Sequence, residues 1–227
     1  MISIVIPAFN EETRIIRTLK KLLKFNSKYR CIKEIIAVNN GSTDNTLKIL
    51  MKYTKTIKLV NLPVNLGKGG GIRAGILSAK GDYVLFVDAD NPVSVEKILE
   101  MQNKLKNSDI VIGRKARIKP FSITRFILGK SFVILVNVLF NLSIWDVLTG
   151  FKGFRRDVAL DLFQDLKFTG WIFDLEMLIK AKMRKYKIDV IDVQWTYDKE
   201  SKLRPFQDSI KIFIDVLKLR SRIHEIK

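Results

Sequence analysis

Two aspartates that stand one residue apart, Asp88 and Asp90, give the strongest chemical signal in the sequence. They follow the apolar run Tyr83–Val87, which predicts a buried strand that ends directly before the pair. Two carboxylates this close repel each other, and a divalent cation keeps both of them ionised. Mg²⁺ or Mn²⁺ takes a few carboxylates together with substrate phosphates, so a metal here indicates a nucleotide diphosphate as ligand. The alternative interpretation is an acidic turn at a strand end that binds no metal.

Glycine is concentrated in residues 67–71, where Lys68 is the only other residue. The pattern Gly-x-Gly-x-x-Ala over residues 69–74 fits the fingerprint of dinucleotide-binding proteins, and Asp88 follows at about the required distance. We expect a tight loop before a helix over Gly71–Ala79, where the backbone or Lys68 approaches a phosphate. A flexible turn without a ligand and a nicotinamide-dependent oxidoreductase built on this segment are the alternatives.

The chain has one cysteine, Cys31, and one histidine, His224. A single cysteine excludes an internal disulfide and a cysteine-based zinc site. Residues Met1–Pro7 lack the pattern of a signal peptide. Together with the single cysteine, this makes a reducing compartment the default expectation. A single histidine near the C-terminus argues against Ser-His-Asp or Cys-His catalysis. Any metal is therefore expected to be a hard cation held by carboxylates.

Short apolar runs alternate with longer amphipathic stretches along the first half of the chain. The runs that predict strands are Ile2–Ile6, Ile35–Val38, Ile57–Leu62, Tyr83–Val87 and Ile110–Ile112. The stretches that predict helices are Glu11–Phe25, Asp44–Tyr53, Gly71–Ala79 and Val95–Leu105. Strands that are apolar on both faces and alternate with helices predict an α/β fold with a mainly parallel, doubly wound sheet.

Ligands of such sheets bind beyond the carboxyl ends of the strands. This places three segments around one crevice: Pro7–Glu12, Asn39–Ser42 and Asp88–Asn91. Ser42 or Thr43 is a candidate cap for the helix that follows the second segment. We find no linker and no internal repeat, so we expect a single domain over residues 1–227.

The second half of the chain combines positive charge with an apolar stretch. The 41 Lys and Arg outnumber the 23 Asp and Glu, which gives a net charge of +18, and no acidic residue occurs between Ile110 and Trp145. Within that region, Ser131–Trp145 is almost wholly apolar, but its 15 residues fall short of the ~20 that span a bilayer. We expect an amphipathic or buried helix there, and a basic amphipathic helix over Phe206–Ile223. Positive charge beside an apolar helix suits a ligand with an anionic head and a greasy tail.

The charge also suits a basic nucleic-acid-binding protein, which is the alternative from another class. That interpretation leaves Asp88 and Asp90 unexplained, so nucleic acid is not among the partners that we expect. Farther along the chain, Asp146–Arg156 predicts a turn and a short strand, and Ile188–Trp195 predicts another strand. Asp174 and Glu176 begin a predicted helix, where carboxylates complement the helix dipole, and their spacing alone assigns them no role in a site.

Several segments, in chain order, resemble the motifs of family 2 glycosyltransferases with the GT-A fold. Residues 7–12 (PAFNEE) resemble the family's P-A-Y-N-E opening, and residues 39–46 (NNGSTDNT) resemble its D-D-G-S-x-D-x-T motif. Residues 66–69 and 88–90 resemble its glycine loop and metal motif. The segments that look like the dolichyl-phosphate glucosyltransferase branch are Asp146–Arg156, Trp171–Leu178 and Gln194–Leu203.

The resemblance implies a role for each matching residue. It implies that residues 1–112 bind the nucleotide sugar and that residues 113–227 bind the acceptor. The residues implied to contact the nucleotide sugar are Pro7, Ala8, Phe9, Asn10, Glu11, Asn39, Asn40, Lys68, Asp88, Ala89, Asp90 and Arg114. Among these, Asp88 and Asp90 hold the metal and, with Arg114, are the implied catalytic residues. The residues implied to grip the acceptor phosphate are Arg117, Arg125 and Lys130.

The activity implied by the resemblance is an inverting, metal-dependent transfer of a hexose to a polyprenyl or dolichyl phosphate. Glucose from UDP-glucose is the favoured donor, and a mannose synthase-like enzyme that uses GDP-mannose is the alternative. The cofactor would be Mg²⁺ or Mn²⁺, and the protein would lie peripherally on an anionic membrane surface, at its cytoplasmic face. Asn39 and Asn40 replace the family's paired aspartates, which leaves the identity of the base open.

Overall fold

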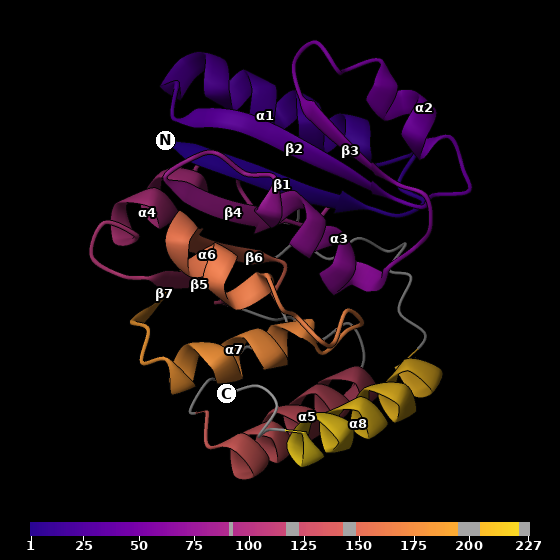
Figure 1. The fold of residues 1–227 in the computed structure, drawn as a ribbon, viewed down its shortest axis with the longest axis vertical. Helices are drawn as coiled ribbons and strands as arrows, with labels where there is room; N and C mark the ends of the chain where they lie inside the picture. The colour runs from indigo at the N-terminus through magenta and orange to yellow at the C-terminus, as the bar shows by residue number, and fades with distance from the viewer. Residues whose placement is uncertain (91–92, 117–122, 143–148, 195–204, 223–227) are drawn as a thin grey trace.

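The computed structural model describes residues 1–227 except 91–92, 117–122, 143–148, 195–204 and 223–227, and of residues 123–130 and 205–211 it describes only the backbone. Its centre is a seven-stranded sheet in the order β3-β2-β1-β4-β6-β5-β7 (Figure 1). The strands are β1 (Ile2–Ala8), β2 (Ile32–Asn40), β3 (Lys58–Leu62), β4 (Tyr83–Val87), β5 (Ile110–Lys115), β6 (Phe151–Arg155) and β7 (Ile188–Val193). All neighbouring pairs of these strands are parallel except the two that include β6. The expected mainly parallel α/β sheet is confirmed.

Helices cover both faces of the sheet. They are α1 (Ile15–Tyr29), α2 (Thr46–Met51), α3 (Gly67–Leu77), α4 (Lys97–Lys104), α5 (Ile123–Phe140), α6 (Arg156–Phe163), α7 (Phe173–Met183) and α8 (Pro205–Ser221). One core lies between the sheet and α1 and α4, and a second core lies between the opposite face and α3, α6 and α7. Ile4 and Ile6 of β1 belong to the first core, whereas Val5 belongs to the second. Alternate residues of a strand point to opposite faces, which explains why β1 is apolar at successive positions.

The carboxyl ends of β1 and β4 lie where the order of the strands reverses. The chain runs outward from β1 to β2 and β3, and then returns to place β4 on the other side of β1. Loops that leave two such strands diverge, and this is where open α/β sheets bind their ligands. The predicted segments 7–12 and 88–90 therefore meet at one edge, with the end of β2 beside them.

Strand β6 brings the second half of the chain to the same edge. It runs antiparallel between β4 and β5, and its register pairs Val87 with Phe151 and Phe86 with Lys152. The start of β6 thus lies beside the end of β4, next to Asp88. The sequence predicts a short strand here but not its direction.

The glycine segment is not the loop that we expected, because α3 begins at Gly67 and contains all of it. The first N–H groups of a helix need acceptors outside the helix. The carbonyl of Thr169 accepts the N–H groups of Gly69 (2.8 Å) and Gly70 (3.4 Å). A Cβ on Gly69 would lie 2.5 Å from the Cβ of Phe173, so glycine lets α3 touch the start of α7. These N–H groups are already bonded to Thr169, so they do not form the phosphate-binding turn of a dinucleotide fingerprint, and that interpretation is wrong.

The expected caps of α2 are also wrong, because its start lies at Thr46. The hydroxyl of Ser42 instead accepts the backbone N–H of Asn10 (3.1 Å), and the backbone N–H of Thr43 donates to Asn10 Oδ1 (2.8 Å). Asp44 Oδ1 accepts the N–H of Thr46 (2.9 Å). The polar residues after β2 therefore fasten the loop after β1, which the site needs.

Helices α5 and α8 lie side by side at the opposite end of the molecule from α2 (Figure 1). Val136 and Phe140 of α5, and Val216 and Leu219 of α8, belong to the core on the α3 side of the sheet. The predicted helices in these two regions are confirmed within the described residues. No helix in the described part of the chain is both long enough and apolar enough to cross a membrane.

The contact between α3 and β1 predicts the effect of Gly75→Ala. Alanine normally stabilises a helix relative to glycine, but a Cβ at this position would overlap Val5 Cγ1 and lie 3.0 Å from Val38 Cγ2. We expect overpacking to lower the free energy of unfolding by about 1–3 kcal/mol in urea denaturation. Gly170→Ala is the control, because nothing lies within 4 Å of its Cβ position. A Gly75→Ala protein as stable as the parent would contradict this packing.

Candidate active site

Asp88 is fixed at the end of β4 by the turn that precedes β6. Its backbone N–H donates to the carbonyl of Gly150 (3.1 Å), and a Cβ on Gly150 would overlap the Asp88 carboxylate. On the other side, the hydroxyl of the buried Thr18 in α1 donates to the carbonyl of Ala89 (2.6 Å). The Asp88-Ala89-Asp90 backbone is therefore held between β6 and α1, and both carboxylates leave the sheet at its carboxyl edge.

Lys68 pairs with Asp88 at the carboxyl edge of the sheet. Its Nζ lies 2.7 Å from Asp88 Oδ1, and the two side chains keep 26% and 21% of their surface exposed. Nζ also lies 5.9 Å from the ring centre of Trp171, which is 38% exposed in the loop before α7. Burial alone would lower the pKa of Lys68, but the charges of Asp88, Asp174 and Asp90 outweigh it, so the pKa is raised. Lys68 is therefore a permanent cation at neutral pH.

Asp90 has no such partner. Its Oδ1 is buried, and no hydrogen-bond partner for this atom is found in the described part of the chain. Burial, followed by the charge of Asp88, raises the pKa of Asp90 to about 6, and Arg14 opposes this only in part. Arg14 is itself held by Glu11 through two hydrogen bonds of 2.7 Å. The charges of Arg14 and Lys68 therefore only partly offset the burial of the Asp90 carboxylate and its repulsion by Asp88.

A second ion pair lies beneath the first. Lys152 of β6 and Asp174 of α7 are 3.0 Å apart, with side chains 0% and 5% exposed. Lys152 Nζ also donates to the carbonyl of Thr149 (2.5 Å) and lies 5.5 Å from the ring centre of Phe86. Burial raises the pKa of Asp174, and the charges of Lys152 and Lys68 offset this only partly. Asp174 therefore connects the turn beside Asp88 to the start of α7.

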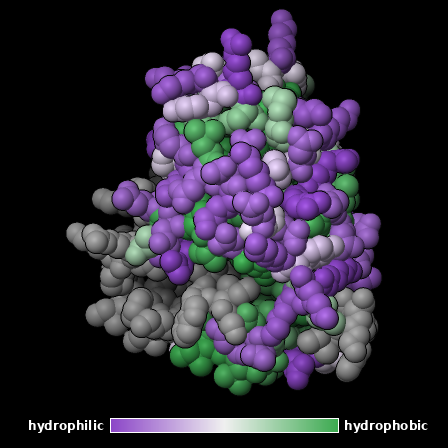
Figure 2. Space-filling view, turned by 90° about the vertical axis from the view of Figure 1, so that its left-hand side faces the viewer, coloured by the Kyte–Doolittle hydropathy of each residue, from purple (hydrophilic) through white to green (hydrophobic). Residues whose placement is uncertain are grey.

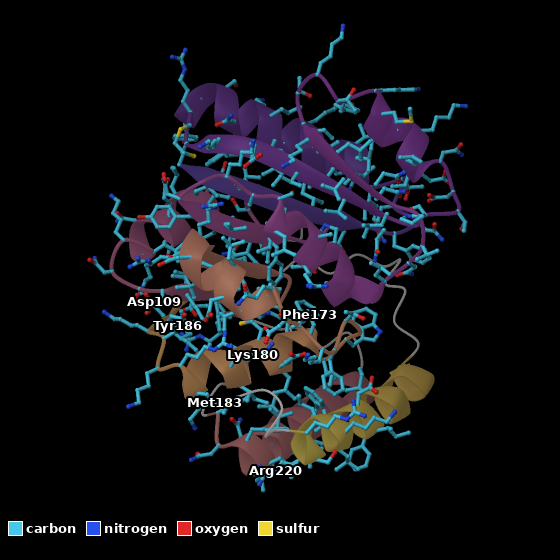
Figure 3. The ribbon with its side chains drawn as sticks, viewed as in Figure 1. Asp109, Phe173, Lys180, Met183, Tyr186 and Arg220 are labelled. Carbon is cyan, nitrogen blue, oxygen red and sulfur yellow. The ribbon has the colours of Figure 1, made fainter. Side chains whose placement is uncertain are left out.

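Glu176, also in the first turn of α7, stabilises the loop that precedes this helix. It is buried, and its carboxylate accepts the backbone N–H groups of Lys167 (3.0 Å) and Phe168 (2.7 Å). Lys180, labelled on α7 in Figure 3, lies 2.8 Å from it. These contacts shape the loop before α7, which carries Thr169 and Trp171.

The predicted residues 7–11 lie at the carboxyl end of β1 and directly after it. Pro7 and Ala8 close the strand, and Phe9 follows with 38% of its surface exposed. Asn10 adopts a left-handed conformation (φ 56°) and is tied to the loop after β2. The backbone N–H of Glu11 donates to the Thr46 hydroxyl (2.7 Å), so both loops form one rim.

Asn39 and Asn40 are buried and make contacts that only amides can make. Asn39 Nδ2 donates to Asn61 Oδ1 (2.7 Å) on β3. Asn40 Nδ2 donates to the carbonyl of Gly67 (2.9 Å), and its Oδ1 accepts the N–H of Leu66 (3.0 Å). Aspartate could accept but not donate here, so these asparagines fit the loop that precedes α3.

Of the predicted arginines and Lys130, only Arg114 has a described side chain, and it pairs with Asp192. Arg114 lies on β5 with its Nε 2.7 Å from Asp192 Oδ1 on β7, and this contact raises the pKa of Arg114. Arg117 lies outside the described residues. Arg125 and Lys130 lie in α5, where the backbone alone is described, so their assignment to the acceptor phosphate stays a prediction.

Four contributors to the site escaped the sequence analysis: Arg14, Thr18, Gly150 and Lys152. Glu11 and Arg14 have the i, i+3 spacing of neighbours on one helical turn, which could have indicated their ion pair. Gly150 and Lys152 lie in the segment Asp146–Arg156, which the family resemblance singled out without assigning them a role. The contact of Thr18 with the Ala89 carbonyl joins residues distant in the sequence, for which the local sequence gives no signal.

The donor set fits a divalent cation that is shared with a ligand. Among the described residues, no group of three or more Asp, Glu, His or Cys side chains could hold a metal ion. Asp88 and Asp90 supply two carboxylates, and one buried oxygen of Asp90 has no hydrogen-bond partner among the described residues. A hard cation completes its shell with water and substrate phosphates in such a site.

The sequence of the chain matches a known protein family. Residues 3–163 match the model of the family described as "Glycosyl transferase family 2". The chain belongs to this family, and it is a glycosyltransferase.

Relatives in the family match nearly the whole chain. A dolichyl-phosphate beta-glucosyltransferase of Dictyostelium discoideum is 34% identical over 97% of this chain and 74% of its own length. One of Homo sapiens is 34% identical over 97% of this chain and 75% of its own length. Among solved structures, the Mycobacterium tuberculosis glucosyl-3-phosphoglycerate synthase in complex with Mn²⁺ and UDP has a TM-score of 0.75. The match covers 97% of this chain and 79% of the synthase chain, at 20% sequence identity. This likeness confirms the GT-A fold.

The raised pKa of Asp90 predicts an unusual dependence of stability on pH. An acid whose pKa rises on folding destabilises the protein once the pH exceeds its unfolded value, ~4. In EDTA, we expect Asp90→Asn to be more stable than the parent at pH 7, on the order of 1–2 kcal/mol because water screens part of the effect. The difference should disappear below about pH 4, where Asp90 is protonated in both states. Urea denaturation across this range tests it, and an equal difference at pH 4 and pH 7 would refute it.

The buried pair predicts a second pH-dependent effect. Lys152→Met leaves Asp174 buried without its partner, which costs about 3–5 kcal/mol of unfolding free energy at neutral pH. Because this substitution raises the pKa of Asp174 further, the loss should shrink as the pH falls and Asp174 takes up a proton. The double variant Lys152→Met, Asp174→Asn should recover much of the stability at pH 7. A loss that is independent of pH would mean that Lys152 acts through packing alone.

Proposed function

We propose that this glycosyltransferase transfers glucose from UDP-glucose to the phosphate of a dolichyl or another polyprenyl phosphate. The observation that carries the proposal is the 34% identity, over 96–97% of the chain, to several enzymes named dolichyl-phosphate beta-glucosyltransferase. The donor is supported by the M. tuberculosis synthase of the same fold, which has been crystallised with Mn²⁺ and UDP-glucose.

Asp88 and Asp90 are the residues that would hold Mg²⁺ or Mn²⁺ together with the donor diphosphate. When bound, the cation would stabilise the negative charge that develops on the leaving diphosphate. The buried, unpartnered oxygen of Asp90 and the raised pKa of this residue support a positive charge at that position. Lys68, already 2.7 Å from Asp88, supplies a second positive charge at the same edge.

The rim after β1 is the proposed place for the nucleotide. Pro7, Ala8, Phe9, Asn10 and Glu11 lie at the strand-order reversal, where α/β sheets bind nucleotides, and Phe9 keeps 38% of its surface exposed. Asn39 and Asn40 act there by holding the rim and the start of α3 in place. Arg114 would have to exchange Asp192 for the donor phosphates in order to contact them.

The acceptor needs positioning more than activation. A lipid monophosphate has its second pKa near ~6, so its attacking oxygen is already anionic at neutral pH. The buried carboxylate of Asp174 forms an ion pair with Lys152. We therefore assign Asp174 no role as a general base. Attack on the sugar's C1 from the side opposite the diphosphate breaks the C1–O bond to UDP and inverts the configuration. The product would be a β-linked polyprenyl phosphoglucose and UDP.

Because the acceptor is a lipid, we place the reaction at a membrane surface, and we assign it to the cytoplasmic face. The basic residues implied to grip the acceptor phosphate, Arg117, Arg125 and Lys130, follow β5 in the acceptor half of the chain. Their positive charge would offset the repulsion between the acceptor phosphate and the donor diphosphate.

The direct test is a transfer assay with Mn²⁺ or Mg²⁺, a polyprenyl phosphate, and UDP-glucose or GDP-mannose. Asp90→Ala should lower metal-dependent transfer from UDP-glucose by at least ~100-fold, because the leaving diphosphate loses its electrostatic stabilisation. Asp157→Asn is the matched control, since this exposed aspartate follows β6 at the opposite edge of the sheet and pairs with Arg155. Full activity of Asp90→Ala would contradict the assignment of Asp90 as a metal ligand. Transfer from GDP-mannose, with none from UDP-glucose, would show that the transferred sugar is mannose.

A further inference from the structure

A hollow lies at the amino edge of the sheet, opposite to the edge that carries Asp88 and Asp90. This amino-edge hollow has a volume of about 430 Å³ and is lined by Lys80, Gly81, Asp82, Tyr83, Leu105, Lys106, Arg155, Arg156 and Asp157. Tyr83 begins β4 and pairs with Arg155 at the end of the antiparallel β6. Because a strand rises ~3.3 Å per residue, Tyr83 lies roughly 16 Å from Asp88. The amino-edge hollow is therefore separate from the candidate active site.

Positive charge predominates in the amino-edge hollow. Four of the nine residues that line it are Lys or Arg, and two are Asp. Both acids are already paired, because Asp157 lies 3.1 Å from Arg155 and Asp82 binds the amino group of Met1. Figure 2 views the molecule from the side where β1 begins, and hydrophilic surface predominates over the middle of that view. The paired acids therefore do not neutralise the other cations of the hollow.

Three of these cations have no carboxylate partner. Among the described residues, Lys80, Lys106 and Arg156 form no ion pair, and all three are exposed. They come from separate places in the chain, since Lys80 precedes β4, Lys106 follows α4 and Arg156 begins α6. Such cations, brought together by the fold around one hollow, repel one another until an anion lies between them.

The backbone beneath the cations is fixed by hydrogen bonds. The Nε of Arg156 donates to the carbonyl of Ala79 (3.0 Å), and the backbone N–H of Arg156 donates to the carbonyl of Asp82 (2.9 Å). The backbone N–H of Lys80 donates to Glu34 Oε1 (2.6 Å). An anion would therefore meet a wall whose main chain needs no rearrangement, which lowers the entropic cost of binding.

The chemistry of the lining favours phosphate groups. Ammonium and guanidinium groups both form charge-assisted hydrogen bonds with phosphate oxygens, and several oxygens can serve several cations at once. The half-buried Tyr83 and the buried Leu105 add less polar surface to the lining. The volume of the hollow lies within the range of ~300–1,000 Å³ that is usual for sites of small organic molecules.

We propose that the amino-edge hollow binds a small soluble molecule with a phosphate or diphosphate group through Lys80, Lys106 and Arg156. This site is additional to the donor and acceptor sites of the proposed function and does not depend on them. A long polyanion such as nucleic acid fits less well, because the exposed carboxylates of Asp82 and Asp157 would repel its neighbouring phosphates.

The test is titration calorimetry with inorganic pyrophosphate in the presence of EDTA. The double variant Lys80→Gln, Lys106→Gln should bind pyrophosphate at least ~10-fold more weakly than the parent, because it loses two charge-assisted hydrogen bonds. Added salt should weaken the binding to the parent, since the cations are exposed. Both substitutions are at the surface, so circular dichroism and the urea midpoint should not change.

Two controls separate the hollow from other sources of positive charge. The matched variant Lys20→Gln, Lys21→Gln removes the same charge from exposed positions on α1 and should bind pyrophosphate as the parent does. Lys68→Gln removes the cation beside Asp88 and should keep the binding that the Lys80, Lys106 variant loses.

Four outcomes would overturn the proposal. Equal weakening in the two double variants would mean that only the net charge attracts pyrophosphate. Loss of binding in Lys68→Gln, with none in the Lys80, Lys106 variant, would place pyrophosphate at the candidate active site. A parent that does not bind pyrophosphate would show that the hollow is not a phosphate site. Binding of single-stranded RNA that is lost in the Lys80, Lys106 variant, without binding of pyrophosphate, would assign the hollow to nucleic acid.

Discussion

Lys68 reaches Asp88 from the first turn of α3, and this ion pair joins three parts of the chain that are far apart in sequence. Asp88 is held by Gly150 before β6, and α3 is held by Thr169 before α7. Lys152 and Asp174 then connect β6 to α7. Charges of opposite sign alternate through this arrangement, so a change at one position alters the electrostatic energy at the next. At Asp90, burial and the charge of Asp88 outweigh the charges of Arg14 and Lys68, and this balance is the electrostatic basis for the cation that we propose there.

The sequence was sufficient for the sheet but not for the contacts that complete the site. The first five strands are apolar on both sides, a local pattern, and their carboxyl ends define the crevice. The start of α3 could not be predicted, because its N–H groups depend on the Thr169 carbonyl, about a hundred residues away. The direction of β6 and the pairing of Lys152 with Asp174 depend equally on tertiary contacts. Helix α6 was missed because it follows β6 without an intervening loop.

At several positions of the family's motifs, side chains make contacts within the chain itself. The resemblance implied that Asn39 and Asn40 contact the nucleotide, yet their amides are engaged with Asn61, Leu66 and Gly67. A residue at a motif position can thus serve the site by shaping the loop that borders it. The same holds for Glu176, whose carboxylate orders the loop before α7.

The outer strands of the sheet have a consequence for the behaviour of the protein in a crowded cell. An open sheet leaves unpaired N–H and C=O groups on its first and last strands, and such edges can pair with other chains and aggregate. Here β3 begins with Lys58, whose Nζ binds the carbonyl of Ser78, and β7 carries Asp189 and Asp192. Bringing a further strand against either edge would place it next to these charges. The two borders of the sheet are therefore protected against the self-association to which a chain so rich in apolar strands is otherwise prone.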